Sequence, residues 1–181
     1  MIDVSVLNQS IRHYISQVTG LDIDTAVRKA DQDAPTGSDP FASVKIILVS
    51  KIGHDEIKNS DQSTPSIDIN ENRSGNREFT ASINFFNSNA LNNAYKMQGS
   101  VYENANHDFL ISKSIGFVRS SDVRDLTEID LARYEERGQL DMFFNAIDNN
   151  TNTVSSIQSQ EIDGTFEVDG KTYNNIIEVT Q

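Results

Sequence analysis

Two adjacent carboxylates, Glu135 and Glu136, stand between two arginines and precede an apolar segment. Paired carboxylates can serve as general acid and general base when both flank one substrate bond. However, apolar side chains alternate with period two along residues 134–147, which predicts a long strand. Neighbouring side chains on a strand point to opposite faces, so these two carboxylates cannot share a substrate. We interpret the segment as ion-pairing residues at a sheet or subunit boundary, namely Arg133, Glu135, Glu136 and Arg137.

A second group with chemical potential is His54, Asp55 and Glu56. Three consecutive residues cannot close the coordination sphere of a metal ion without a second cluster at suitable spacing. The chain also has no cysteine, no glycine-rich phosphate loop, no G-x-S-x-G turn and no H-E-x-x-H motif. We therefore predict no catalytic residue, no metal site and no cofactor.

Charge is distributed unevenly along the 181 residues, whose formal net charge is -12. Residues 121–181 carry thirteen acids and four bases. Affinity for nucleic acid comes from lysine and arginine that neutralise phosphates, so this part of the chain should repel DNA. The predicted DNA-repelling surface contains Glu161, Asp163, Glu167 and Asp169.

The length is that of one domain, and we expect a single domain over residues 1–181. The first residues lack the basic and apolar regions of a signal peptide, and no stretch approaches 18 consecutive apolar residues. We expect a soluble protein that is made in a cytosol.

The periodicity predicts the elements that position these residues. Apolar positions from Leu7 to Val18 recur at helical spacing between a capping Asp3 and Gly20. A second helix, capped by Ser88, should bury Leu91, Ala94, Tyr95, Gln98, Val101 and Tyr102. Strands are predicted at 41–52, 79–86, 115–118 and 134–147, and a hairpin turn is predicted at Asp169 and Gly170. The segments between them are predicted to be a loop at 31–40, a polar loop or hairpin extension at about 53–78 and a polar link at 122–130.

Three segments in order give the chain a family resemblance: VRKADQDAPTGSDPFASVKI, REFTASINFFNSNALNNAYKMQGSV and IGFVRSSDVRDLTEIDLARYEERGQLDMFFNA. The features are an A-x-Q loop at Ala30 with Pro35, Pro40 and Phe41 leading into a strand, and SINFF entering a helix through NALNNAY. A third is a leucine-threonine link before an E-R strand at Glu136. Over residues 25–148 the chain resembles the phage neck or tail terminator family.

The resemblance implies a small α+β subunit, with a mixed or antiparallel β-sheet and two main helices packed on it. Such subunits assemble as rings, most often hexamers, which cap the tail tube and bind a neck, connector or stopper protein. The protein would then be a structural component of the virion and not an enzyme. DNA would pass through the ring lumen without specific binding, and the acidic residues of the last third are the candidate lining.

Other classes of protein stay open at this point. A stopper or head-completion ring would show the same sequence features. A metal-dependent hydrolase would use His54, Asp55 and Glu56 with a remote carboxylate. A monomeric acidic adaptor or DNA mimic would bind a basic partner.

Overall fold

A computed structural model describes residues 2–31, 38–59, 68–130, 133–155, 159–169 and 171–180. The chain divides into two compact units. The first unit is Met1–Asp55 with Ser74–Asn149, and the second is Glu56–Arg73 with Asn150–Gln181. The organisation of the whole chain as one domain stays a prediction.

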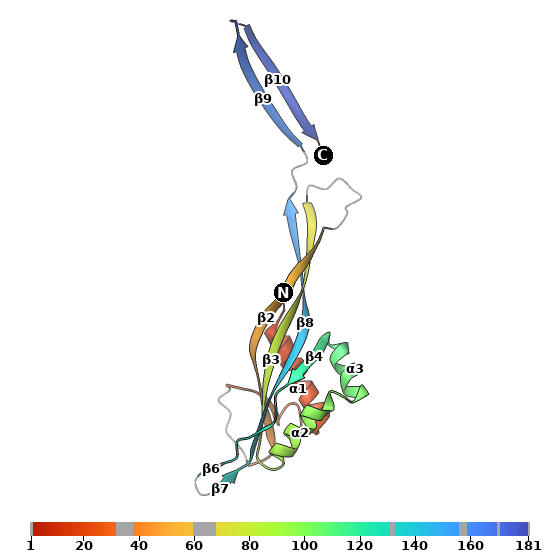
Figure 1. Ribbon diagram of the computed structural model, residues 1–181, viewed down its shortest axis with the longest axis vertical. Helices are drawn as coiled ribbons and strands as arrows, with labels where there is room; N and C mark the ends of the chain where they lie inside the picture. Colours follow the sequence, from red (N-terminus) through yellow and green to blue (C-terminus); the bar gives the residue numbers. More distant parts are fainter. Residues whose placement is uncertain are drawn as a thin grey trace. The chain divides into compact units, whose positions relative to one another are not determined.

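Helices and strands are both well represented (Figure 1). The helices are α1 (Val4–Thr19), α2 (Ala90–Ser100) and α3 (Asn104–Ser112). The strands are β1 (Val27–Lys29), β2 (Phe41–Asn59), β3 (Asp68–Phe86), β4 (Ile115–Ser120), β5 (Arg124–Asp125), β6 (Glu128–Asp130), β7 (Arg133–Glu135), β8 (Arg137–Ser155), β9 (Ser159–Val168) and β10 (Lys171–Thr180).

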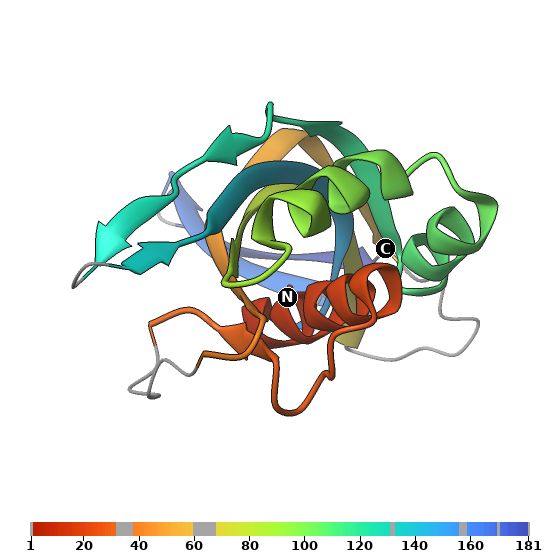
Figure 2. The same cartoon turned by 90° about the horizontal axis from the view of Figure 1, so that it is seen from below.

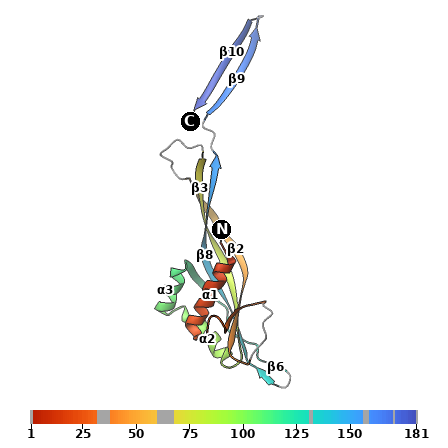
Figure 3. The same cartoon turned by 180° about the vertical axis from the view of Figure 1, so that it is seen from behind.

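The main sheet has the strand order β1-β2-β3-β8-β4, and β5 also pairs with β8. β1 runs parallel to β2, whereas β4 and β5 run antiparallel to β8. The sheet is therefore mixed, and α1, α2 and α3 of the first unit lie on one face of it (Figures 1 and 3). The predicted α+β fold is confirmed.

The core of the first unit lies between this sheet face and the helices. Alternate residues of β3 and β8 are fully buried there, as strand geometry requires for one covered face. They include Phe79, Ala81, Ile83 and Phe85 of β3 and Leu140, Met142 and Phe144 of β8. The Phe79 and Phe144 rings stack across the two strands with centroids 5.4 Å apart, so aromatic packing adds to the burial of apolar area.

Helix α1 forms as the sequence predicts. The Asp3 carboxylate accepts a hydrogen bond from the Ser5 amide at 2.8 Å and caps the N-terminus. Gly20 ends the helix with φ of 76°, a left-handed conformation that glycine adopts at little cost. The predicted apolar positions Leu7, Ile11 and Ile15 are buried, and Figure 2 shows α1 and α2 lying side by side.

Helix α2 differs from its prediction at both its start and its buried face. It begins at Ala90 after Asn89, not after Ser88. Its buried residues are Ala90, Asn93, Ala94, Met97 and Ser100. Tyr95 and Tyr102, predicted to be buried, are 54 % and 84 % exposed. Ala94 of the predicted face is buried, but Met97 and the polar Asn93 and Ser100 complete that face in place of the tyrosines. Helix α3 was not predicted.

The predicted polar link at 122–130 contains the short strands β5 and β6. The single strand predicted at 134–147 is divided in the structure into β7 and β8, which are separated at Glu136. In the part of the chain that the structure describes, no helix is long and apolar enough to cross a membrane.

Residues 53–78, predicted as a polar loop or hairpin extension, include the ends of two strands. Residues 53–59 belong to β2 and residues 68–78 to β3, and these strands are neighbours in the sheet. Residues 60–67 lie outside the described residues, as do positions 32–37 of the predicted loop at 31–40.

In the second unit, β9 and β10 pair antiparallel with Val168 opposite Lys171. This register leaves two residues for the turn, as the Asp-Gly pair predicted. Asp169 has φ of 52°, the positive value that such a turn requires. Gly170 lies outside the described residues.

Candidate functional site

Glu136 occupies the break between β7 and β8 and caps helix α2. One carboxylate oxygen accepts the Asn89 amide and the other accepts the Leu91 amide, each at 3.1 Å. The Asn89 side chain makes no capping hydrogen bond, and the Glu136 carboxylate takes its place. A negative charge here also complements the positive end of the helix dipole. The Glu136 carbonyl accepts the Asn87 amide at 2.9 Å, which ties the turn before α2 to the same residue.

Gly138 allows α2 to approach the sheet closely. A Cβ atom at this position would lie 2.8 Å from the Ala90 carbonyl oxygen and 3.1 Å from the Leu91 Cα. Both are backbone atoms that cannot move without shifting the helix. Glu136 and Gly138 therefore fix the first turn of α2 against the beginning of β8.

Arg137, between them, points to the opposite side of the sheet and ends a row of four side chains. Its guanidinium lies 5.2 Å from the centre of the Phe86 ring and donates to Asn84 Oδ1 at 3.1 Å. Phe86 stacks on Phe41 at 4.5 Å, and the Arg28 guanidinium lies 5.0 Å from the Phe41 ring. The row thus crosses the adjacent strands β1, β2, β3 and β8 by cation–π and stacking contacts.

This row lines a depression of about 380 Å³ on the sheet face opposite the helices. We call it the basic groove, because its lining includes the cations Arg28, Lys29, Lys45 and Arg137. Asp31 is the one acid of the described lining and pairs with Lys45 at 2.7 Å. Both side chains of that pair are more than half exposed, so the pair contributes little to stability. The groove keeps an excess of positive charge in a strongly acidic protein.

The other residues of the predicted boundary lie in the β6–β7 ribbon. Glu135 stands opposite Glu128 and Arg133 opposite Asp130 in the antiparallel register. Like charges in opposite positions destabilise a ribbon, so the Glu128–Glu135 pair does not stabilise this one. The structure brings Glu136 and Arg137 together with α2 and the groove, whereas Glu135 belongs to the ribbon.

Asp55, proposed above as one ligand of a metal-dependent hydrolase, is held by two cations. The Arg77 guanidinium contacts both of its oxygens, at 2.8 and 3.3 Å, and the Lys51 ammonium lies 3.2 Å away. The hydrogen bond from Arg77 is the largest cause that lowers the pKa of Asp55 from 3.8 to about 2. Glycine at position 75 provides the space for this carboxylate, since a Cβ atom there would lie 1.9 Å from Asp55 Oδ1. Arg77 also pairs with Asp148 at 3.2 Å.

Among the described residues, the sequence neighbours of Asp55 form no cluster of metal ligands. His54 is exposed, and Glu56 pairs with Lys58 at 3.0 Å. Within the described ranges, no three histidine, aspartate or glutamate side chains are grouped so that they could hold a metal ion.

The acidic residues of the predicted DNA-repelling surface belong to the second unit. Glu161, Asp163 and Glu167 are in β9, opposite Glu178, Ile176 and Thr172 of β10. Asp169 is in the turn and is exposed. The structure thus places all four on one hairpin.

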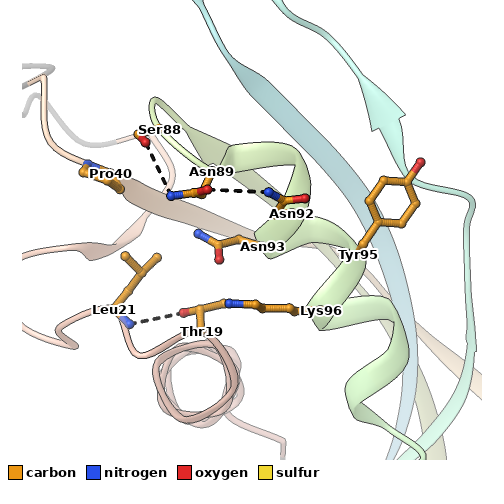
Figure 4. A pocket seen from close by; sticks show the side chains of 9 residues that line it. All are labelled: Thr19, Leu21, Pro40, Ser88, Asn89, Asn92, Asn93, Tyr95 and Lys96. Carbon is orange, nitrogen blue, oxygen red and sulfur yellow. Dashed lines mark hydrogen bonds between the residues drawn. The ribbon is translucent and has the colours of Figure 1, made fainter.

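A larger hollow of about 720 Å³ opens beside α2 (Figure 4). It is lined by Thr19, Leu21, Pro40, Ser88, Asn89, Asn92, Asn93, Tyr95 and Lys96. None of these lining residues carries a carboxylate or an imidazole. Amides and hydroxyls dominate, and several bond to one another, as Asn89 does to Ser88 at 3.4 Å and Asn92 to Asn89 at 3.5 Å.

The described residues form a small α+β subunit with helices on one face of a mixed sheet, which is the fold that the resemblance implies. The comparison with known families agrees, since the model of the phage neck terminator protein family matches residues 5–173. The chain therefore belongs to the phage neck terminator protein family, a family of structural proteins of the bacteriophage virion. The resemblance noted in the sequence is confirmed. A search of curated proteins found no match.

Sequence reasoning missed the basic groove. Its cations come from β1, β2 and β8, and Arg28 is more than a hundred positions from Arg137. The available signal was that both Arg28 and Arg137 lie within segments that carry the family resemblance. Only the strand order brings those segments side by side.

The cap predicts a difference between two adjacent glutamates. Glu136→Ala should lower the free energy of unfolding by about 1–2 kcal/mol, because the amides of Asn89 and Leu91 at the N-terminus of α2 lose their acceptor. Glu136→Gln keeps an acceptor and should lose less. Chemical denaturation measures both, and hydrogen exchange should accelerate at the Leu91 amide. Glu135→Ala is the matched control with little expected effect, and equal losses at positions 135 and 136 would contradict the capping role.

The low pKa of Asp55 predicts acid sensitivity. Because the pKa is lower in the folded state, the stabilisation is complete above about pH 4 and is lost as the pH falls toward about 2. The denaturation midpoint of the wild type should fall across this window, and that of Asp55→Asn should fall less. Asp108→Asn, at an exposed position on α3, is the control. Equal pH dependence in wild type and Asp55→Asn would refute the assignment.

Proposed function

We propose that the protein is the ring-forming terminator that closes the head-proximal end of the phage tail tube and joins it to the neck. The observation that carries this proposal is the family match, which extends over residues 5–173. Six copies form the ring, which binds the tube protein on one side and a neck, connector or stopper protein on the other. Assembly takes place in the host cytoplasm.

The sheet supplies surfaces that suit self-assembly. β1 and β4 are its outer strands, and an outer strand presents unpaired backbone groups to a neighbouring chain. The face opposite the helices carries exposed apolar residues beside polar ones, among them Ile47 at 59 % and Ile147 at 56 % exposed. Large apolar side chains grouped on a surface mark places where proteins associate.

Termination requires the two sides of the ring to differ. A tube grows because each added ring offers the next one the same surface. A terminator binds the last ring through one surface and presents another that accepts no tube protein. Growth then stops, and the neck has a defined place to bind.

The tail itself provides the test. A phage that lacks this gene should assemble tails of irregular and excessive length that do not join to heads, as seen by electron microscopy. Expression of the wild-type protein in trans should restore normal virions. Tails of normal length beside heads that lose DNA would indicate a stopper or head-completion protein instead.

Residues 161–169 lead to a separate proposal about DNA. They carry four acids and no base, and acidic side chains that line the DNA path would repel phosphates. The substitutions Glu161→Gln, Asp163→Asn, Glu167→Gln and Asp169→Asn together should slow DNA ejection, measured by the release of encapsidated DNA. Neutralising the exposed Asp24 and Asp108 is the control. Unchanged ejection from correctly assembled particles would exclude this role.

A further inference from the structure

The hollow beside α2 contains a buried carboxamide that pairs with no residue the structure describes. Asn93 is 8 % exposed, and its side chain forms no hydrogen bond within the described part of the chain. Figure 4 shows this side chain turned from α2 into the hollow, toward Leu21 and Pro40. Buried polar side chains in folded proteins nearly always have a partner, so the donor and acceptor of Asn93 point to an occupant of the hollow.

A cation lies beside this carboxamide on the same face of α2. Asn89, Asn93 and Lys96 recur at helical spacing, so they follow one another along one side of the helix. Figure 4 shows the Lys96 side chain extending across the hollow toward Thr19. Lys96 is exposed and forms no ion pair with a described residue. The amide and the ammonium therefore meet an occupant from the same direction.

The remaining lining indicates the chemistry of the occupant. Leu21 and Pro40 are apolar and lie across the hollow from α2, and Tyr95 is at the rim. A carboxamide offers a donor and an acceptor side by side, as an extended peptide does along its edge. A peptide can thus pair with Asn93 while its side chains pack on Leu21 and Pro40. The described lining has one cation and no acid, so a carboxylate on that peptide would be attracted to Lys96.

We propose that the hollow beside α2 binds an extended acidic segment of another virion protein. The inference rests on the proposed function, because it gives the chemistry of the segment by which a partner at the junction would bind this chain. The Asn93 carboxamide pairs with the backbone of the segment, and the Lys96 ammonium pairs with a carboxylate that the segment carries. Neither side-chain group bonds to a described residue, so both are available to a partner.

Photo-crosslinking in the particle identifies the occupant. The photoreactive residue p-benzoylphenylalanine in place of Asn92, which is exposed in the lining, should join the chain to one contiguous segment of another virion protein. Mass spectrometry of the adduct should find aspartate or glutamate within that segment. The same substitution at Tyr102, which is 84 % exposed and outside the lining, is the control and should not reach that segment. An adduct with a second copy of this chain, with a segment free of acids, or with no peptide at all in complete particles would overturn the proposal.

Binding of a synthetic peptide with the sequence of the cross-linked segment tests the two contacts in the purified protein. Fluorescence anisotropy should show that Asn93→Leu and Lys96→Gln each weaken binding by about tenfold or more. Asn93→Leu preserves the size of the side chain and removes no hydrogen bond to a described residue, so the thermal unfolding midpoint should change little. Lys113→Gln is the control, because this lysine is exposed at the C-terminal end of α3 and lies outside the lining. Unchanged affinity in either lining variant would refute the site.

A double-mutant cycle tests the ion pair. A peptide whose acids are changed to the corresponding amides should bind the wild type about tenfold less well. Against Lys96→Gln the same peptide should lose little more, because the pairing is already absent. Losses that simply add would show that the carboxylate and Lys96 do not meet.

The outcomes distinguish this inference from the function on which it rests. If the phage without the gene makes tails of irregular length and position 92 joins no acidic segment, the peptide site is wrong and the terminator stands. If that phage makes tails of normal length, the proposed function fails, whatever the crosslinking gives. An acidic segment joined at position 92, together with weaker binding in both lining variants, supports the site.

Discussion

The fold of the first unit depends on how the first turn of α2 is held against the start of β8. The Glu136 carboxylate binds two amides of that turn, and Gly138 lets the helix backbone approach to a distance that no other residue would permit. Because a helix end leaves amides without partners, this distant acceptor satisfies a need that the local sequence does not meet. Arg137 lies between these two residues and points to the opposite face, so the helix contact and the groove are built from one segment.

The interruption at Glu136 also determines where the β6–β7 ribbon begins. An uninterrupted strand would pair along its whole length and leave no separate ribbon. Glu136 instead uses its carbonyl and its carboxylate to bind the turn before α2, and β7 continues into a ribbon with β6. The capping of α2 by Glu136 therefore separates the exposed Ile129 and Tyr134 from the core sheet.

Periodicity was sufficient where one face of an element meets the core through large side chains. It predicted α1 with both of its caps and the alternation from Leu140 to Phe144. For α2 it was right at Ala94 and wrong at Tyr95, because Met97 and the polar Asn93 and Ser100 complete the buried face and leave the tyrosine exposed. The cap could not be predicted, since Glu136 acts on residues more than forty positions away. The basic groove needed the strand order, which nothing local in the sequence specifies.

The charges of the chain are segregated, with cations grouped in the basic groove and acids elsewhere. A net charge of -12 would make identical copies repel one another unless cations were concentrated where the copies meet. Four cations line the basic groove, and two of them, Arg28 and Arg137, stack on aromatic rings, whereas an acidic excess occupies residues 121–181. Screening by salt weakens such exposed charges, but the stacked rings and apolar side chains retain their attraction. Association that combines charge pairing with apolar burial gains its specificity from the charges and keeps its stability in salt through the buried apolar side chains.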